Sequence, residues 1–181
     1  MLPVERPPSP DPVADPDAYR EHLLGLLGED DPAVVQSATP GELRTLADRA
    51  GPALAMRPMA DEWSVLECVG HIFDAEVVMS GRYRWVVAHD EPPLIGYDQD
   101  LWVDRLRHGA DDPHELLGAF ESLRRANVAF WQRTLPKDRS RVGVHAERGP
   151  ESYETMFRML AGHDRFHTAQ ARRALDAVTT S

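Results

Sequence analysis

Two histidines near the C-terminus are candidate metal ligands. His163 and His167 are four residues apart, within residues 152–178, where apolar residues recur at helical spacing. On a helix this spacing places both imidazoles on one face, one turn apart, so they can share a metal ion. Alternatively both are buried, hydrogen-bonded core histidines, because such a pair alone is not specific. A third ligand from elsewhere in the chain therefore decides between the two interpretations.

His71 is the candidate third ligand. It lies in a stretch capped by Ser64 and running to about residue 88, which is apolar nearly all round and therefore predicts a buried helix. One line along this helix is nevertheless polar, with Glu67, His71, Asp74 and Arg82. Because buried polar groups need partners, the line faces either partners or a lined cavity. Three histidines leave a coordination position open, which is typical of a catalytic metal site.

Composition and charge narrow the functional class. The 181 residues carry a formal net charge of −10, which argues against nucleic-acid binding. The sequence has no basic amphipathic stretch for anionic lipid and no apolar run of the roughly 20 residues that span a bilayer, so no membrane association is expected. The single cysteine, Cys68, allows no intrachain disulfide, and no signal peptide is visible. We therefore expect a cytoplasmic protein.

Helix-start signals predict an all-α architecture. The proline-rich residues 1–14 are expected to form an N-terminal tail, and residues 15–178 a single domain. Capping residues followed by proline occur at Asp15-Pro16, Asp31-Pro32, Thr39-Pro40 and Asp112-Pro113. The helices they predict cover about 17–27, a short segment after 32, 40–50 and 113–135. Residues 64–88 and 152–178 are predicted to form two further helices. The long helices together are predicted to form a four-helix bundle.

The connections are expected to hold only short elements. Residues 89–112 should contain a short helix near 98–102, and residues 136–151 a polar crossover; no stretch alternates as a strand does. A connection as long as 89–112 can cross the full length of a helix. The helices on either side of it therefore need not be antiparallel.

The order of the motifs resembles the DinB/YfiT-like family of metal-binding four-helix bundles from about residue 15 onward. The motifs are Trp63-Ser64-x-x-Glu67-x-x-x-His71-x-x-Asp74-x-Glu76, Arg82-x-Arg84, Asp98-x-Asp100-x-Trp102, the His145–Gly149 segment and Gly162-His163-Asp164-x-x-His167-x-x-Gln170. The resemblance implies an up-down-down-up bundle, frequent dimers, and a divalent ion, commonly zinc or nickel, on His71, His163 and His167. Its characterised relatives include thiol-dependent transferases and isomerases that use bacillithiol or mycothiol.

Three functions follow as hypotheses. The first is a transferase in which the metal lowers the pKa of a low-molecular-weight thiol, which then attacks an electrophilic substrate. The second is a metal-dependent hydrolase that uses the same pocket with water as the nucleophile. The third is a non-catalytic metal-binding or stress-related bundle. An open coordination position beside an empty pocket would favour the first two.

Several other residues have expected roles around the metal. Arg82 is a candidate catalytic and thiol-binding residue that could hold a carboxylate, or else pairs with Glu67 or Asp74. Asp74 is the other catalytic candidate. Glu67, Asp74, Asp164 and Gln170 are the candidate groups behind the metal ligands, where they would orient the imidazoles.

The remaining sulfur and imidazole groups are given structural roles. Cys68 is one turn before His71 and could ligate, but a lone buried cysteine usually acts as a small hydrophobe. His145 lies in a loop and could reach the site, but it is expected to support structure. His22, His89, His108 and His114 lack ligand spacing and are interpreted as surface residues.

Overall fold

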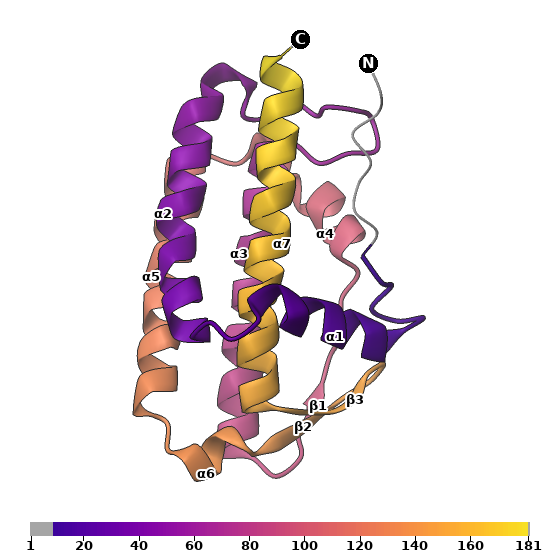
Figure 1. Ribbon diagram of the computed structural model, residues 1–181, viewed down its shortest axis with the longest axis vertical. Helices are drawn as coiled ribbons and strands as arrows, with labels where there is room; N and C mark the ends of the chain where they lie inside the picture. Colours follow the sequence, from indigo (N-terminus) through magenta and orange to yellow (C-terminus); the bar gives the residue numbers. More distant parts are fainter. Residues whose placement is uncertain (1–8, 181) are drawn as a thin grey trace.

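Four long helices form the bundle shown in Figure 1, a computed structural model that describes residues 9–180. They are α2 (Pro32–Ala50), α3 (Val65–Ala88), α5 (Pro113–Arg133) and α7 (Tyr153–Thr179). In Figure 1, α2 and α7 run upward and α3 and α5 run downward, so the chain has the predicted up-down-down-up order. The parallel pair α3 and α5 is possible because the connection between them returns over the full length of the bundle.

Shorter elements fill the connections. They are α1 (Pro16–Leu27), η1 (Gly51–Ala53), α4 (Gln99–Leu106), η2 (His108–Ala110) and α6 (Pro136–Arg139), with strands β1 (Pro93–Leu94), β2 (Val142–His145) and β3 (Gly149–Ser152). The predicted tail lies partly outside the described residues, because only 9–14 of it are described. Within the described part of the chain, no helix has the length and apolar character needed to cross a membrane.

The helix that carries His71 begins where the sequence predicts. The Ser64 hydroxyl accepts from the Glu67 N–H at 3.2 Å, and the Glu67 carboxylate accepts from the Ser64 N–H at 2.8 Å. This reciprocal capping box satisfies two amide donors that the first turn of a helix otherwise leaves unpaired. Its residues are buried, so α3 starts at a fixed point and the side chains further along it are held in register.

The predicted break at Thr39-Pro40 is wrong, because α2 continues through Pro40 as one helix. Proline has no N–H, so the carbonyl of Gln36, four residues earlier, loses its helical partner. The structure replaces that partner with the Arg124 guanidinium of α5, whose Nη1 donates to the Gln36 carbonyl at 3.1 Å. A tertiary contact therefore satisfies the group that proline leaves open, which local sequence cannot reveal.

A small sheet replaces part of the predicted crossover. Strand β1 pairs with β2 in parallel and β2 pairs with β3 antiparallel, with His145 opposite Gly149. Gly149 has φ of 73°, a conformation that favours glycine and closes the hairpin. Strands of two to four residues are too short to show alternation in the sequence. The sheet matters for function because it places His145, a buried residue, beside the bundle.

Helix α1 packs across α7 at a glycine next to the metal-ligand candidates. A Cβ at Gly162 would lie 1.9 Å from the backbone oxygen of Leu23, so the two backbones approach too closely for any side chain. Figure 1 shows α1 lying across the front of α7. Gly162 directly precedes His163, so this crossing fixes α7 where the site begins.

We expect Gly162→Ala to destabilise the fold by about 1–3 kcal/mol or more. The added methyl group would clash with the backbone of α1, and no rotamer change can relieve that clash. The matched control is Gly118→Ala on α5, where a Cβ meets nothing within 4 Å. That change should be neutral or stabilise by up to about 1 kcal/mol. Urea denaturation measures both free energies of unfolding. Equal midpoints for the two variants would contradict the close approach.

Candidate metal centre

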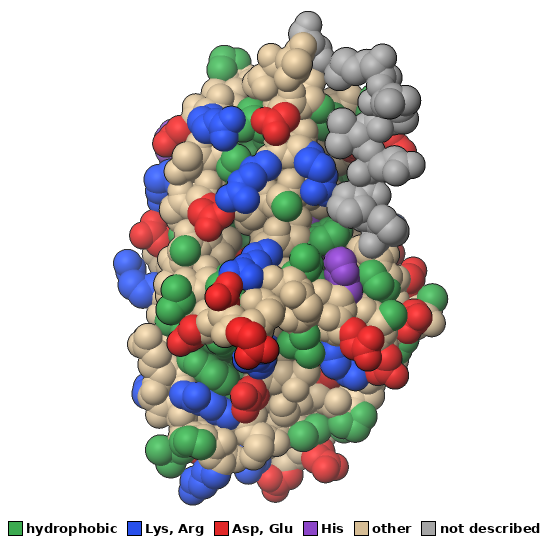
Figure 2. All heavy atoms as spheres, viewed as in Figure 1, with side chains coloured by type: hydrophobic (Ala, Val, Ile, Leu, Met, Phe, Trp, Pro, Cys, Tyr) green, Lys and Arg blue, Asp and Glu red, His purple; other side chains and the backbone are tan. Residues whose placement is uncertain are grey.

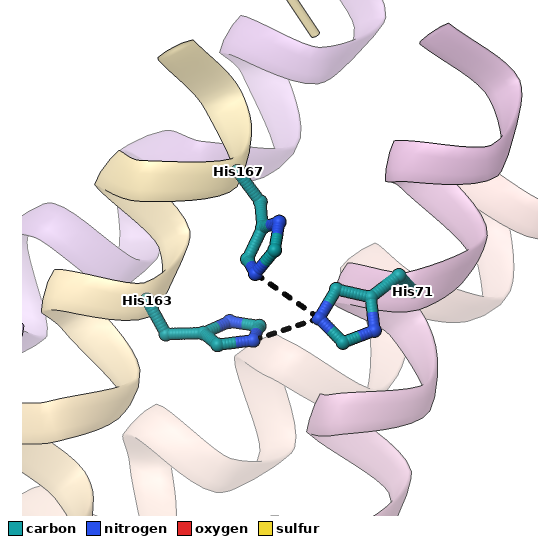
Figure 3. Close-up of side chains that lie close together, drawn as sticks. All are labelled: His71, His163 and His167. Atoms are coloured by element: carbon teal, nitrogen blue, oxygen red, sulfur yellow. Dashed lines mark hydrogen bonds between the residues drawn. The ribbon is translucent and has the colours of Figure 1, made fainter. Parts of the chain in front are cut away.

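Three imidazoles from two helices converge in the bundle core (Figure 3). His71 projects from α3, and His163 and His167 project from α7 one turn apart. The Nε2 atom of His71 lies 2.9 Å from Nε2 of His163 and 3.2 Å from Nε2 of His167. All three residues are at most 7 % exposed. The same ring nitrogen of each residue therefore points at one spot.

This geometry fits a shared cation better than it fits hydrogen bonding among the rings. Metal–nitrogen bonds of about 2.0–2.1 Å at tetrahedral angles place ligand nitrogens about 3.3 Å apart. The Nδ1 atom of His167 lies 2.9 Å from the Gln170 Oε1, which can only accept, so the proton sits on Nδ1 and the Nε2 lone pair is available. The lone pair of His167 Nε2 is thus directed at the centre, where one metal ion could bind all three nitrogens.

Electrostatics keep these rings in the form that binds metal. Burial lowers the pKa of His71 well below its usual value, and the neighbouring His167 and His163 lower it further. Burial and the nearby Arg124 cation lower the pKa of His163 to about 3. Metal binding requires neutral imidazole, so no proton has to be removed from these two rings at neutral pH.

A tryptophan covers one side of the centre and a pocket reaches the other. The ring of Trp63, a buried residue just before α3, lies 4.9 Å from the His71 ring and 5.8 Å from the His167 ring, between centroids. A pocket of about 450 Å³ between α1, α3, α7, the β2–β3 turn and residues 96–100 is lined by His163. Access to the centre is therefore from the His163 side. Trp63 belongs to one of the sequence motifs, but no pattern in the sequence predicts its contact with the histidines.

The residues predicted to orient the imidazoles divide into two groups. Gln170 contacts His167 directly, as described above. Glu67 instead caps α3 and binds the Arg57 guanidinium, with Oε1 2.6 Å from Arg57 Nη2. Asp164 contacts Arg124 and accepts from the Thr39 hydroxyl at 2.8 Å. These contacts give Glu67 and Asp164 roles in other networks of the bundle.

Asp74 binds a histidine outside the centre. Its Oδ2 lies 2.7 Å from Nε2 of His108, whose Nδ1 lies 2.7 Å from Asp111. His108 is buried, so its predicted surface position is wrong. A Cβ on Gly70 would lie 2.3 Å from the His108 ring, so the ring packs directly on α3 beside His71. The Asp74 hydrogen bond raises the pKa of His108. Among the other predicted surface histidines, His89 and His114 are exposed and His22 is half-buried.

Arg82 lies in the pocket wall without either predicted acidic partner. Its Nη2 donates to the Ile95 carbonyl and faces Nε2 of His145 at 3.2 Å. His145 is buried and anchored in the sheet, and its Nδ1 accepts from the backbone N–H of Glu147 at 3.2 Å. Cys68 lies in the buried aliphatic cluster, outside the group of converging ligand atoms.

We expect replacing Gln170 by leucine to weaken metal binding by about 10–100-fold, because the His167 ring loses the acceptor that fixes its proton and orientation. Competition with a chromophoric chelator measures this change. The matched control is Gln99→Leu, which removes a glutamine that lines the pocket from α4. An unchanged affinity in Gln170→Leu would show that the contact does not support the centre.

Comparison with known proteins places the chain in a family. A protein of Oceanobacillus iheyensis, named as a proposed metal-dependent hydrolase, is 24 % identical to this chain over 114 residues. The matched segment covers 62 % of this chain and 65 % of the relative, which is just under two thirds of the relative's length. YfiT of Bacillus subtilis, described with an unusual four-helix bundle topology, superposes with a TM-score of 0.73 at 15 % identity and covers 90 % of this chain and 89 % of its own. The model of the DinB superfamily matches residues 37–171. The chain belongs to the DinB superfamily.

Proposed function

We propose that this protein is a metal-dependent hydrolase whose divalent ion is held by His71, His163 and His167. The observation that carries the proposal is the convergence of three Nε2 atoms beside a pocket that one of the histidines, His163, lines. The names of the Oceanobacillus relative and of YfiT, both proposed metal-dependent hydrolases, support the same class. Imidazole donors suit zinc and nickel, and we propose one of these as the resident ion.

Each part of the centre has a distinct contribution in this proposal. A divalent ion supplies Lewis acidity, which lowers the pKa of water or of a thiol and so provides a nucleophile near neutral pH. Three protein ligands leave room for a further group on the pocket side, where His163 lines the wall. Trp63 covers His71 and His167 and keeps water from their outer side. Gln170 holds the His167 ring in the orientation that presents Nε2.

A thiol-dependent transferase is the second candidate. Arg82 in the pocket wall favours it, because this arginine has no acidic hydrogen-bond partner among residues 9–180 and could bind the carboxylate of a thiol of the bacillithiol or mycothiol type. The thiol would then attack an electrophilic small molecule in the same pocket. A non-catalytic bundle is the third candidate, and access from the pocket to His163 argues against it.

Two measurements on untagged protein test these candidates together. Elemental analysis should find about one zinc or nickel ion per chain. A panel of esters and amides is then assayed with and without a chelator, in parallel with thiol transfer from bacillithiol and mycothiol to an electrophile. Chelator-sensitive hydrolysis without thiol supports the hydrolase, and strict thiol dependence supports the transferase. Stoichiometric metal without either activity would favour the non-catalytic bundle.

We also propose a homodimer. The exposed side chains of Val77 and Trp85, two turns apart on α3, leave apolar surface for a second copy to cover. Sedimentation at micromolar concentration should show the dimer mass, and charged substitutions at both positions should produce monomer. A monomer in the unmodified protein would exclude this expectation.

A further inference from the structure

The guanidinium of Arg82 is a buried cation with an incomplete set of partners. Arg82 is 4 % exposed, and its Nε atom has no hydrogen-bond partner within residues 9–180. Its contacts there are the Ile95 carbonyl, the Met79 sulfur at 3.7 Å and the His145 ring. Glu151, an acid whose charge reaches Arg82, is engaged by Arg148 at 2.7 and 3.1 Å. Buried charges normally have a counter-charge, so an acceptor is missing from this place.

The contact between Arg82 and His145 also lacks an acceptor. The Nδ1 atom of His145 faces the backbone N–H groups of Glu147 and Arg148, which can only donate, at 3.2 and 3.4 Å. Nδ1 must then be the acceptor, and a neutral ring carries its proton on Nε2, which faces Arg82 Nη2. In the other tautomer, Nδ1–H would face the two amides. The two amides therefore favour the form with the proton on Nε2, in which Nε2–H and Arg82 Nη2 are donors facing each other. An anionic oxygen beside Nη2 and Nε2 would accept from both.

The pocket joins this donor pair to the metal centre along one face of α3. His71 and Arg82 are eleven residues apart, about three turns and a rise of about 16 Å. Between them, Ala75 and Met79 line the pocket on α3, and Leu160 lines it on α7, where His163 marks the far end. The pocket therefore has Arg82 and His145 at one end, apolar side chains along α3 and α7, and the candidate metal centre at the other end. Its lining also includes the carboxylates of Asp11, Asp98, Asp100 and Glu147, and Figure 2 shows Asp and Glu side chains gathered over the first turns of α1. Arg82, with its neighbours His145 and Arg148, is the part of the lining that attracts an anion.

We propose that Arg82 and His145 form a carboxylate-binding subsite, and that the substrate is an elongated carboxylate with an apolar middle. The carboxylate accepts from Arg82 and His145, the apolar part lies on Ala75, Met79 and Leu160, and the other end reaches His163. This deepens the hydrolase proposal and rests on it for the identity of the reacting end. The subsite itself does not depend on the metal.

Calorimetry on chelator-treated, full-length protein tests the subsite without any catalytic readout. The probes are acetate, hexanoate, octanoate, the uncharged octanamide and octyl phosphate. We expect octanoate to bind at least about tenfold more tightly than octanamide, because hydrogen bonds to charged groups contribute more than neutral ones. Affinity should rise from acetate to octanoate by up to about fourfold per buried methylene. Equal binding of octanoate and octanamide would overturn the proposal, as would a preference for octyl phosphate.

Two variants assign the effect to the residues. Arg82→Met should reduce octanoate affinity at least about tenfold while leaving octanamide unchanged. Arg125→Met, which removes an exposed arginine on α5, should bind as the unmodified protein does. If circular dichroism shows that Arg82→Met does not fold, His145→Leu with the octanoate and octanamide pair decides, and an unchanged ratio overturns the proposal. Metal-dependent hydrolysis without octanoate binding would refute only the subsite. Octanoate binding by a protein that takes up neither zinc nor nickel when these ions are added back would refute only the proposed function.

Discussion

Replacing His163 by alanine is expected to abolish metal-dependent turnover while leaving the bundle folded. Loss of a group that only orients a ligand costs about 10–100-fold in metal affinity, so loss of the ligand itself should cost at least about 100-fold. The His163 ring lines the pocket, whereas the bundle is held by aliphatic and aromatic clusters to which His163 does not belong. The free energy of unfolding of the metal-free protein should therefore change little.

The stability of the metal-bound protein should behave differently. An ion that binds only the folded state stabilises it by about 2.7 kcal/mol at 100 times its dissociation constant. Added metal should raise the melting temperature of the unmodified protein and not that of His163→Ala. The exposed His114→Ala is the matched control and should keep both the metal response and the activity. Loss of helical circular dichroism in His163→Ala would instead assign the metal a structural role.

The histidine arrangement could be predicted because it depends on local regularities. The four-residue spacing of His163 and His167 fixes their common face once the segment is helical, and His71 interrupts an otherwise apolar helix. Helix α3 begins at the predicted cap and α7 runs to within a residue of the predicted end. That the three nitrogens converge follows from helix periodicity and from packing two apolar faces together.

The features that could not be predicted from the sequence all involve residues that are distant from one another in the chain. Pro40 has the local signature of a helix start, but Arg124 of α5 supplies the donor that lets α2 continue. His108 has no helical pattern of its own and is buried because Gly70 leaves space for its ring. The contacts of Arg82 depend on the hairpin around His145. Each case requires the packing of separate elements, which local periodicity does not encode.

The same distant packing creates a buried ionic network with large energetic consequences. Arg124 is 1 % exposed on α5 and binds Glu76 of α3, with Nε 2.7 Å from Oε2. It also binds Asp164 of α7, with Nη2 3.1 Å from Oδ1, and the Gln36 carbonyl of α2. One side chain thus links all four bundle helices, and its contact on α7 directly follows the ligand candidate His163.

Arg124→Met is expected to destabilise the fold by about 3–5 kcal/mol or more, because it leaves Glu76 and Asp164 buried without a counter-charge. This is a large part of the 5–15 kcal/mol that typically stabilises a domain. Chemical denaturation measures the loss, and the exposed neighbour Arg125→Met should remain within about 0.5 kcal/mol of the unmodified protein.

If unpaired charge destabilises Arg124→Met, its stability should depend on pH and on the two carboxylates left without a partner. Burial already raises the pKa of Glu76, and removing the cation should raise it further. A carboxyl whose folded pKa is raised favours the folded state at low pH and loses that contribution as pH rises, so the deficit of Arg124→Met should be smaller near pH 4 than at pH 7. Adding Glu76→Gln and Asp164→Asn should recover part of the loss at pH 7, because the stranded charges are then removed. A deficit that stays constant with pH and is not reduced in the triple variant would mean that lost packing around the Arg124 side chain, and not unpaired charge, destabilises the bundle.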